Sequence, residues 1–82
     1  MVLVDIYVPA VGNVYDFQLE EGEKVGTVIE EIGELIGQKE HCRMIGNIDR
    51  LMLCCQKENM ILPKNRTLSE VGIRNGDSLI LV

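Results

Sequence analysis

The chain has 82 residues, of which 46% are hydrophobic and only two are prolines, a composition typical of an ordered domain and not of a disordered segment. Its formal net charge of −5 argues against nucleic acid and anionic membranes as partners, because both are themselves negatively charged. No apolar run approaches the roughly 18 residues that cross a bilayer, and the first residues lack a signal-peptide pattern, so we expect a cytoplasmic protein, without membrane insertion, whose single domain spans residues 1–82.

Two alternating segments at the start of the chain predict a hairpin. Each alternates apolar and polar residues, so each turns one apolar face toward a core. The inward positions are Val4, Ile6 and Val8 in residues 2–8, and Tyr15, Phe17 and Leu19 in residues 14–20. Between the segments, Gly12 and Asn13 tolerate the positive φ that a tight turn often requires. The two segments are therefore predicted to pair as antiparallel strands.

The apolar spacing then changes to three and four residues, which predicts an amphipathic helix. Its apolar stripe consists of Val25, Val28, Ile29, Ile32, Leu35 and Ile36. Gly37 is the predicted end of this helix. Gly26 and Gly33 are each unfavourable in a helix by about 0.8–1 kcal/mol relative to Ala. Either close packing against the sheet or a helix that needs to loosen explains these two glycines.

Three further strands are predicted in the second half of the chain, after a polar connection over residues 38–48 that contains Gly46 and Asn47. They are residues 50–55, with Leu51, Leu53 and Cys55 inward, residues 60–62, and residues 78–82. The turns predicted between them are residues 63–65, a brief helical turn capped by Thr67 or Ser69 and running to Val71, and residues 75–77. The element order β-β-α-β-(β)-β predicts an α+β fold in which a mixed four- to five-stranded sheet packs on one amphipathic helix.

The charge is unevenly distributed along the sequence. Residues 1–40 contain nine acidic residues and two lysines, whereas residues 41–82 contain four acidic and six basic residues. This division predicts one acidic and one mildly basic face. Solvated surfaces explain the same division without a function.

The last third of the chain resembles the closing segment of ubiquitin-like domains, in which a Thr-Leu-Ser helical turn and a tight turn precede the final strand. Residues 66–82 carry this resemblance, and residues 50–53 resemble the third strand of ubiquitin. Within the superfamily, residues 68–73 and 75–79 are most similar to the YukD-like bacterial proteins, with weaker support from residues 15–17. The resemblance implies the ubiquitin-like β-grasp fold and a cytoplasmic accessory of bacterial type VII (WXG100) secretion that contacts protein components of the apparatus.

Two departures limit what the resemblance implies. Ubiquitin and the sulfur carriers of the same fold end in a Gly-Gly tail whose carboxylate is activated, whereas this sequence ends in Leu81 and Val82. We therefore expect a non-enzymatic interaction module that is not conjugated. Residues 54–65 are longer than the matching loop of ubiquitin, so contacts made by that loop are not transferred to this chain.

The residues that most often carry chemistry show no recognisable site. Cys42, Cys54 and Cys55 are odd in number and lack the Cys-x2-Cys spacing of zinc sites, so we expect neither a disulfide framework nor a metal. Cys54 and Cys55 are neighbours in a predicted strand and should point to opposite faces, one buried and one at least partly exposed. His41 adjoins Cys42 without a recognisable oxyanion donor. We expect no catalytic residue and no cofactor. A redox or metal protein is the alternative, and thiol titration with and without zinc tests it.

One exposed apolar patch is predicted on the sheet. If Leu79 and Leu81 point toward the core, their neighbours point away from it, and the same alternation applies to residues 50–54. In ubiquitin-like domains the third and last strands are neighbours, and the matching patch of ubiquitin is its main recognition surface. The predicted protein-binding residues are Arg50, Met52, Cys54, Ile80 and Val82. Three alternatives are open: self-association into a homo-oligomer through this face, no role, and a ubiquitin-like modifier or sulfur carrier whose tail is missing here.

Overall fold

The computed structural model describes residues 1–39, 50–57 and 59–82, which form a five-stranded sheet and one helix. The elements are β1 (Val2–Val8), β2 (Asn13–Leu19), α1 (Val25–Lys39), β3 (Leu53–Cys55), β4 (Met60–Ile61) and β5 (Ser78–Leu81). The strand order is β2-β1-β5-β3-β4, with a parallel β1–β5 pair in the centre and antiparallel pairs elsewhere. The predicted α+β fold, with a mixed sheet on one helix, is confirmed.

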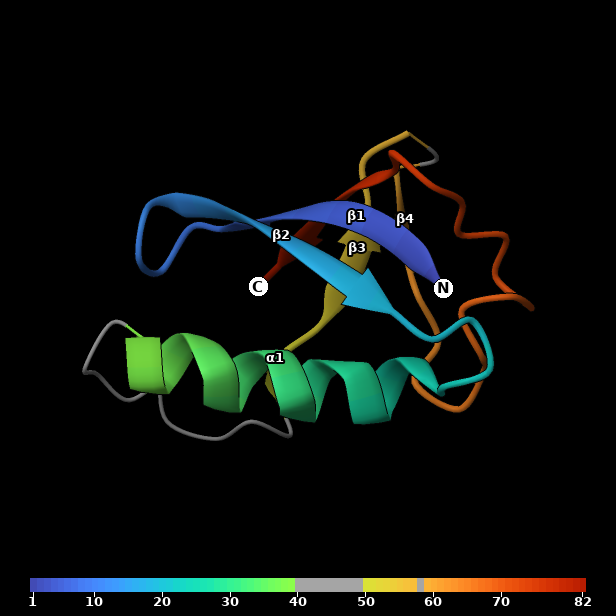
Figure 1. Ribbon diagram of the computed structural model, residues 1–82, viewed down its shortest axis with the longest axis horizontal. Helices are drawn as coiled ribbons and strands as arrows, with labels where there is room; N and C mark the ends of the chain where they lie inside the picture. Colours follow the sequence, from blue (N-terminus) through green and yellow to red (C-terminus); the bar gives the residue numbers. More distant parts are fainter. Residues whose placement is uncertain (40–49, 58) are drawn as a thin grey trace.

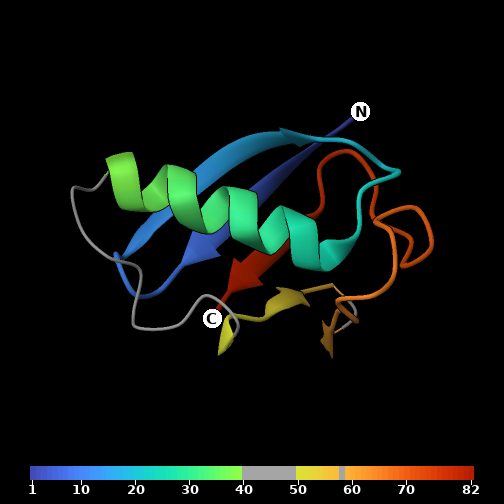
Figure 2. The ribbon, with the colours of Figure 1, turned by 90° about the horizontal axis from the view of Figure 1, so that it is seen from below.

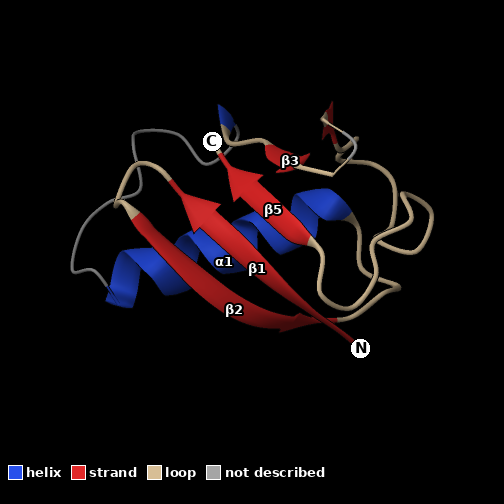
Figure 3. Cartoon of the chain, turned by 90° about the horizontal axis from the view of Figure 1, so that it is seen from above, coloured by secondary structure: helices blue, strands red, loops and turns tan. Residues whose placement is uncertain are grey.

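Helix α1 crosses one face of the sheet, as Figures 1 and 2 show from two directions. The opposite face, turned toward the viewer in Figure 3, has no described element packed on it. Strand β1 shows how the sequence produces this arrangement, because its residues alternate strictly between buried and exposed. The buried residues that fill the space between sheet and helix are all hydrophobic, and they include Val4, Ile6, Val8, Ile29, Ile32, Leu53, Leu79 and Leu81.

The start of α1 is fixed by backbone contacts with residues 64–66. The N–H of Val25 donates to the carbonyl of Arg66 at 2.8 Å, and the N–H of Gly26 donates to the carbonyl of Lys64 at 3.0 Å. These carbonyls satisfy two of the N–H groups that every helix leaves unpaired at its N-terminus. A Cβ at position 26 would lie only 3.2 Å from the Lys64 oxygen. Close packing therefore explains Gly26, although the contact is with the loop at Lys64 and not with the sheet, as the sequence had suggested.

Two predictions for α1 are wrong. The helix continues through Gly37 to Lys39, because Gly37 is not among the described glycines with a positive φ and therefore does not end it. Leu35, predicted to be part of the buried stripe, is 53% exposed, whereas Ile32 and Ile36 are buried. Leu35 lies on the flank of the stripe, where burial depends on how far the sheet extends over the helix.

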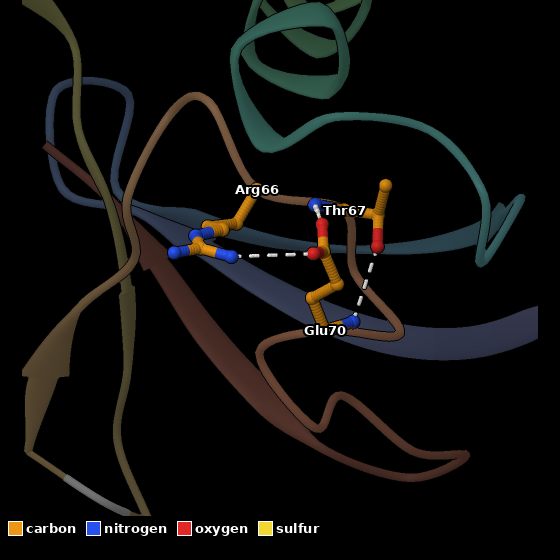
Figure 4. A network of polar contacts seen from close by, with 3 residues as sticks. All are labelled: Arg66, Thr67 and Glu70. Atoms are coloured by element: carbon orange, nitrogen blue, oxygen red, sulfur yellow. Dashed lines mark hydrogen bonds and ion pairs between the residues drawn. The ribbon is translucent and has the colours of Figure 1, made fainter.

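The turn after residue 66 is held by a reciprocal pair of hydrogen bonds, drawn in Figure 4. The N–H of Glu70 donates to Oγ1 of Thr67 at 3.1 Å, and the N–H of Thr67 donates to Oε1 of Glu70 at 2.9 Å. This is a capping box, in which the side chain of each residue accepts a hydrogen bond from the backbone N–H of the other. The hydrogen bond from the Thr67 N–H lowers the pKa of Glu70, and the nearby Arg66 guanidinium, 3.3 Å from Oε2, contributes to the shift. Of the two predicted caps, Thr67 is therefore the one that acts.

The segment Asn75-Gly76-Asp77 is part of the framework. Oδ1 of Asn75 accepts from the N–H of Leu3 at 2.8 Å, and the N–H of Gly76 donates to the Leu3 carbonyl at 2.8 Å. Asp77 closes the turn by accepting from the N–H of Arg74 at 2.9 Å, and Gly76 has a φ of 85°. The residues that carry the sequence resemblance in this segment therefore join β5 to β1, which is a structural task.

Smaller differences concern the edges of elements. Gly12 takes the positive φ in the first turn, and Asn13 already belongs to β2. The third strand begins at Leu53, three residues later than predicted, although Leu51 is buried as expected. The part of the predicted polar connection that contains Gly46 and Asn47 lies outside the described residues.

Candidate protein-binding site

Four of the five residues predicted to bind a partner form cross-strand pairs at the paired ends of β3 and β5. Cys54 lies opposite Ile80 in the antiparallel β3–β5 ladder. Just beyond the ladder, the N–H of Met52 donates to the carbonyl of Val82 at 2.6 Å, and the N–H of Val82 donates to the carbonyl of Met52 at 2.9 Å. These reciprocal bonds make Met52 and Val82 directly opposite neighbours. Arg50 is exposed but precedes the paired segment, so strand register does not join it to the other four.

The four paired residues point away from the helix, as the sequence pattern predicted. Met52 is 38% exposed and Val82 is 47% exposed, while Cys54 and Ile80 are half-buried. Their strand neighbours Leu53, Leu79 and Leu81 are all buried on the helix side. The open face therefore carries two adjacent cross-strand pairs, one of Met52 with Val82 and one of Cys54 with Ile80.

The apolar surface extends beyond the predicted residues. Ile80 is the register partner of Tyr7 on β1, and Tyr7 is the partner of Val14 on β2. On the other side, Cys54 is the partner of Ile61 on β4. Register partners lie on the same face of a sheet, so one line of side chains crosses all five strands. We call this line the apolar row; in sheet order it is Val14, Tyr7, Ile80, Cys54 and Ile61.

Three members of the apolar row were not predicted from the sequence. Val14 is 60% exposed, Ile61 is 57% exposed and Tyr7 is 38% exposed. Alternation already placed Tyr7 outward, but alternation within a strand does not say which residue of another strand lies beside it. The missing information was the order of the strands and their register, which long-range pairing determines.

A polar row borders the apolar row on one side. Asp5 lies opposite Asp16 on β2 and beside Ser78 on β5. The hydrogen bond and the charge repulsion between the two facing carboxyl groups raise the pKa of Asp5. Charged and hydroxyl groups along this border mark the limit of the apolar surface and leave the side toward Met52 and Val82 apolar.

The apolar row ends in a shallow hollow beside β4. Its volume is about 130 Å³, and its lining includes Cys54, Met60, Ile61 and Ile80. Met60 is 43% exposed. The space is of the order of one large side chain, and methionine adapts its shape to different neighbours. Met60 is the register partner of Cys55, which is buried on the helix side, so the hollow lies at the β4 edge of the sheet and is not confined to the open face.

The described residues offer little for metal or thiol chemistry. In residues 1–39, 50–57 and 59–82, no three His, Cys, Asp or Glu side chains gather closely enough to hold a metal ion. Cys54 is half-buried on the open face and Cys55 is buried on the helix side, so the prediction that they point apart is confirmed, and both are free thiols. His41 and Cys42 lie outside the described residues. None of the helices in the described part of the chain is long and apolar enough to cross a membrane.

No protein-family model matches the sequence, and no curated protein matches it either. Among solved structures, an Arabidopsis thaliana ubiquitin-like domain is similar over 99% of this chain and 74% of its own, with a TM-score of 0.73 and 17% identity. The N-terminal ubiquitin-like domain of the 4931431F19Rik protein has a TM-score of 0.72 and 27% identity over 99% of this chain and 72% of its own. Caldiarchaeum subterraneum ubiquitin has a TM-score of 0.73 and 18% identity over 98% of this chain and 89% of its own. These neighbours establish the ubiquitin-like β-grasp fold and support placement in the ubiquitin-like superfamily.

Proposed function

We propose that this chain, a ubiquitin-like domain by its fold, is a non-enzymatic module that binds a protein partner through the open face of its sheet. The observation that carries the proposal is the apolar row together with Met52 and Val82. An exposed apolar cluster of this kind is unusual on a monomeric protein and is typical of an interaction surface. The module acts, in this proposal, as a cytoplasmic accessory of a bacterial type VII (WXG100) secretion apparatus, and it is not conjugated to other proteins.

The open face has the features that a docking surface needs. Its centre, formed by Ile80 and Cys54, is half-buried and packed between neighbours, while Val14, Ile61 and Val82 are more exposed around it. Partner residues that cover such a centre remove apolar surface from water, which stabilises a complex by about 25 cal/mol for each Å² buried. The acidic pair Asp5 and Asp16 at the border favours a partner with a basic rim.

The link to secretion rests on the sequence similarity of residues 68–73 and 75–79 to YukD-like proteins. In the folded chain, Leu68 and Ile73 from this segment are buried, and Gly72 has a φ of 78°. These residues support a shared fold more directly than a shared partner. A binding experiment is therefore the appropriate test of the secretion role.

The experiment compares capture of secretion components from native lysate, membranes included, by the wild-type protein and by a variant with Met52→Asp and Ile80→Asp. We expect the wild type to recover components of the apparatus and the variant to lose them, because two carboxylates in the apolar face oppose desolvation. The matched control is Thr27→Asp with Ser69→Asp, which adds the same charge at an exposed position of α1 and at one in the capping turn.

Melting profiles show whether the substitutions leave the fold intact. If Ile80→Asp unfolds the protein because its side chain is half-buried, Met52→Asp with Val82→Asp replaces it, since both positions are exposed. Equal recovery by the wild type and by folded open-face variants would place the partner on another surface. Recovery of no secretion component by the wild type would remove the secretion role.

Self-association is the second candidate function, and the same open face favours it. Sedimentation of the wild type against the Met52→Asp, Ile80→Asp variant separates the two cases: a dimer that the substitutions dissociate assigns the face to a second copy. The modifier or sulfur-carrier alternative requires a Gly-Gly tail on the native protein. The intact mass of the protein purified from its native source tests that requirement.

A further inference from the structure

The free edge of the sheet and the neighbouring helix form a second surface, separate from the open face. Strand β2 is at one end of the strand order, with β1 on one side and no described strand on the other. In Figure 3 it borders the sheet along its whole length. The opposite edge is formed by β4, which has only two residues, Met60 and Ile61, whereas β2 has seven. The long edge is the one able to pair with a further strand.

The pairing of β1 determines which backbone groups of β2 point outward. The N–H of Asp5 donates to the carbonyl of Asp77 at 3.1 Å, so the backbone groups of Asp5 face β5. Successive residues of a strand direct these groups to opposite sides, so Val4 faces β2, where its partner is Phe17. Phe17 therefore faces β1, and alternate residues face away from the sheet. The residues with outward N–H and C=O groups are Val14, Asp16 and Gln18.

This edge lacks several of the features by which proteins prevent strand addition, and Asp16 is its one charged residue. Edge strands are commonly protected by proline, by lysine or by an irregular bulge. Strand β2 contains no proline or lysine, and its seven residues pair with β1 in continuous register without a bulge. Its edge therefore presents a regular ladder of donors and acceptors to a partner.

A groove runs beside this edge, between β2 and the C-terminal half of α1. Its volume is about 320 Å³, and it is lined by Val14, Tyr15, Asp16, Phe17, Leu35 and Ile36. The rings of Tyr15 and Phe17 lie 6.3 Å apart between centroids and are half-buried. Leu35, exposed against the prediction from its helical spacing, lies on the helix side of the groove. A strand added to β2 would direct every second side chain into this groove.

The charge around the groove is negative. Asp16 is one of its lining residues, although its carboxylate is on the open-face side of the edge, opposite Asp5, and Glu31 lies one helical turn before Leu35, on the same side of α1. Both carboxylates belong to the half of the chain that contains nine acidic residues and two lysines. A basic segment is attracted to this region, and an acidic one is repelled.

We propose that the β2 edge and its groove bind an extended segment of a partner protein, with alternating apolar residues flanked by Lys or Arg, as an added strand. The N–H and C=O groups of Val14, Asp16 and Gln18 bond to the backbone of the segment. Its inward side chains contact Tyr15, Phe17 and Leu35, and its basic residues lie near Asp16 and Glu31. Strand addition of this kind takes affinity from the main chain and specificity from alternate side chains.

The test uses a defined probe, a short peptide of alternating valine and threonine with lysines at both ends, titrated into ¹⁵N-labelled protein and followed by amide chemical shifts. The decisive comparison is Asp16→Asn against Asp16→Pro. Both remove the carboxylate, but only proline removes the outward N–H, and the bonds between β2 and β1 are kept because that N–H faces solvent. We expect shifts along β2 and at Leu35, and affinity about tenfold weaker for Asp16→Pro than for Asp16→Asn.

Three further measurements complete the test. A peptide with glutamates in place of the lysines should bind more weakly, and Leu35→Ser should weaken binding of the lysine peptide while the exposed position keeps the fold intact. The Met52→Asp, Ile80→Asp variant should bind the peptide as the wild type does, which separates this site from the open face. No shifts on β2 at millimolar peptide, shifts confined to the open face, or equal affinity of the proline and asparagine variants would each overturn the proposal.

Discussion

Single residues in this fold act through a few close contacts, and Gly26 is the clearest case. It lies in the first turn of α1, where its N–H bonds to the Lys64 carbonyl at 3.0 Å. Alanine is the better helix former by about 1 kcal/mol, but its Cβ would lie 3.2 Å from that carbonyl oxygen. The oxygen belongs to the backbone segment that caps the helix, so it cannot move without weakening the cap.

We therefore expect Gly26→Ala to lower the free energy of unfolding by about 1 kcal/mol, since overpacking at a close contact outweighs the gain in helix propensity. Urea denaturation measures the change. Gly22→Ala is the matched control, because position 22 has no neighbouring atom within 4 Å and does not have a positive φ. Stabilisation by Gly26→Ala would mean that the loop over residues 63–66 yields freely, and that packing does not explain the glycine.

Asp5 provides a test at the same scale that depends on pH. Asp16 lies opposite it and raises its pKa, through a hydrogen bond and through charge repulsion. A carboxyl group whose pKa is higher in the folded than in the unfolded chain makes the protein less stable as the pH rises through the pKa range. Asp5→Asn should therefore raise the melting temperature at pH 7. The gain should shrink below the ordinary aspartate pKa of 3.8, where the wild type is protonated too. An equal gain at both pH values would assign the effect to something other than charge.

At the scale of elements, alternation and helical spacing were sufficient to predict most of the fold. The strict pattern of β1 and the inward positions of β2 follow from period-two alternation, and the buried side of α1 follows from the spacing of Val25, Val28, Ile29, Ile32 and Ile36. Two boundaries were not predictable in this way. Whether Leu35 is covered depends on the width of the sheet above it, and whether Gly37 ends the helix depends on the conformation it adopts.

The capping box is an element whose contribution is measurable. Thr67→Ala removes the Oγ1 that accepts from the N–H of Glu70 at 3.1 Å, so we expect a loss of about 1 kcal/mol in the free energy of unfolding. Ser69→Ala is the control, because Ser69 is exposed and its side chain makes no hydrogen bond to the described residues. Thermal denaturation of the two variants gives the comparison. A loss that is the same for both would show that the hydroxyl of Thr67 does not act as a cap.

At the scale of the whole molecule, strand order determines which outward residues of different strands lie side by side and form one surface. Tyr7 is far from Cys54 and Ile61 in the sequence, and each of the three is an outward residue of its own strand. Only the order β2-β1-β5-β3-β4 and its register bring them into one row. The part of the site formed by β3 and β5 was predicted because the third and last strands are neighbours in the ubiquitin-like domains that the sequence resembles. The rest of the row required the complete pairing.

The same topology separates the open face from the edge groove, and amide hydrogen exchange tests the register on which that separation depends. The amide of Phe17 is bonded to β1, whereas the amides of Val14, Asp16 and Gln18 face outward along the free edge. We expect the hydrogen-exchange rates of the outward amides to be at least about tenfold higher than the rate of the Phe17 amide. A solvent-exposed N–H exchanges without any opening of the sheet. The amide of Asp5 in β1 provides an internal reference, since its N–H donates to the carbonyl of Asp77 inside the sheet. Protection of Asp16 equal to that of Phe17 would mean that another segment of the chain or a second copy already occupies the edge. The groove would then be an internal contact and would not receive a partner strand.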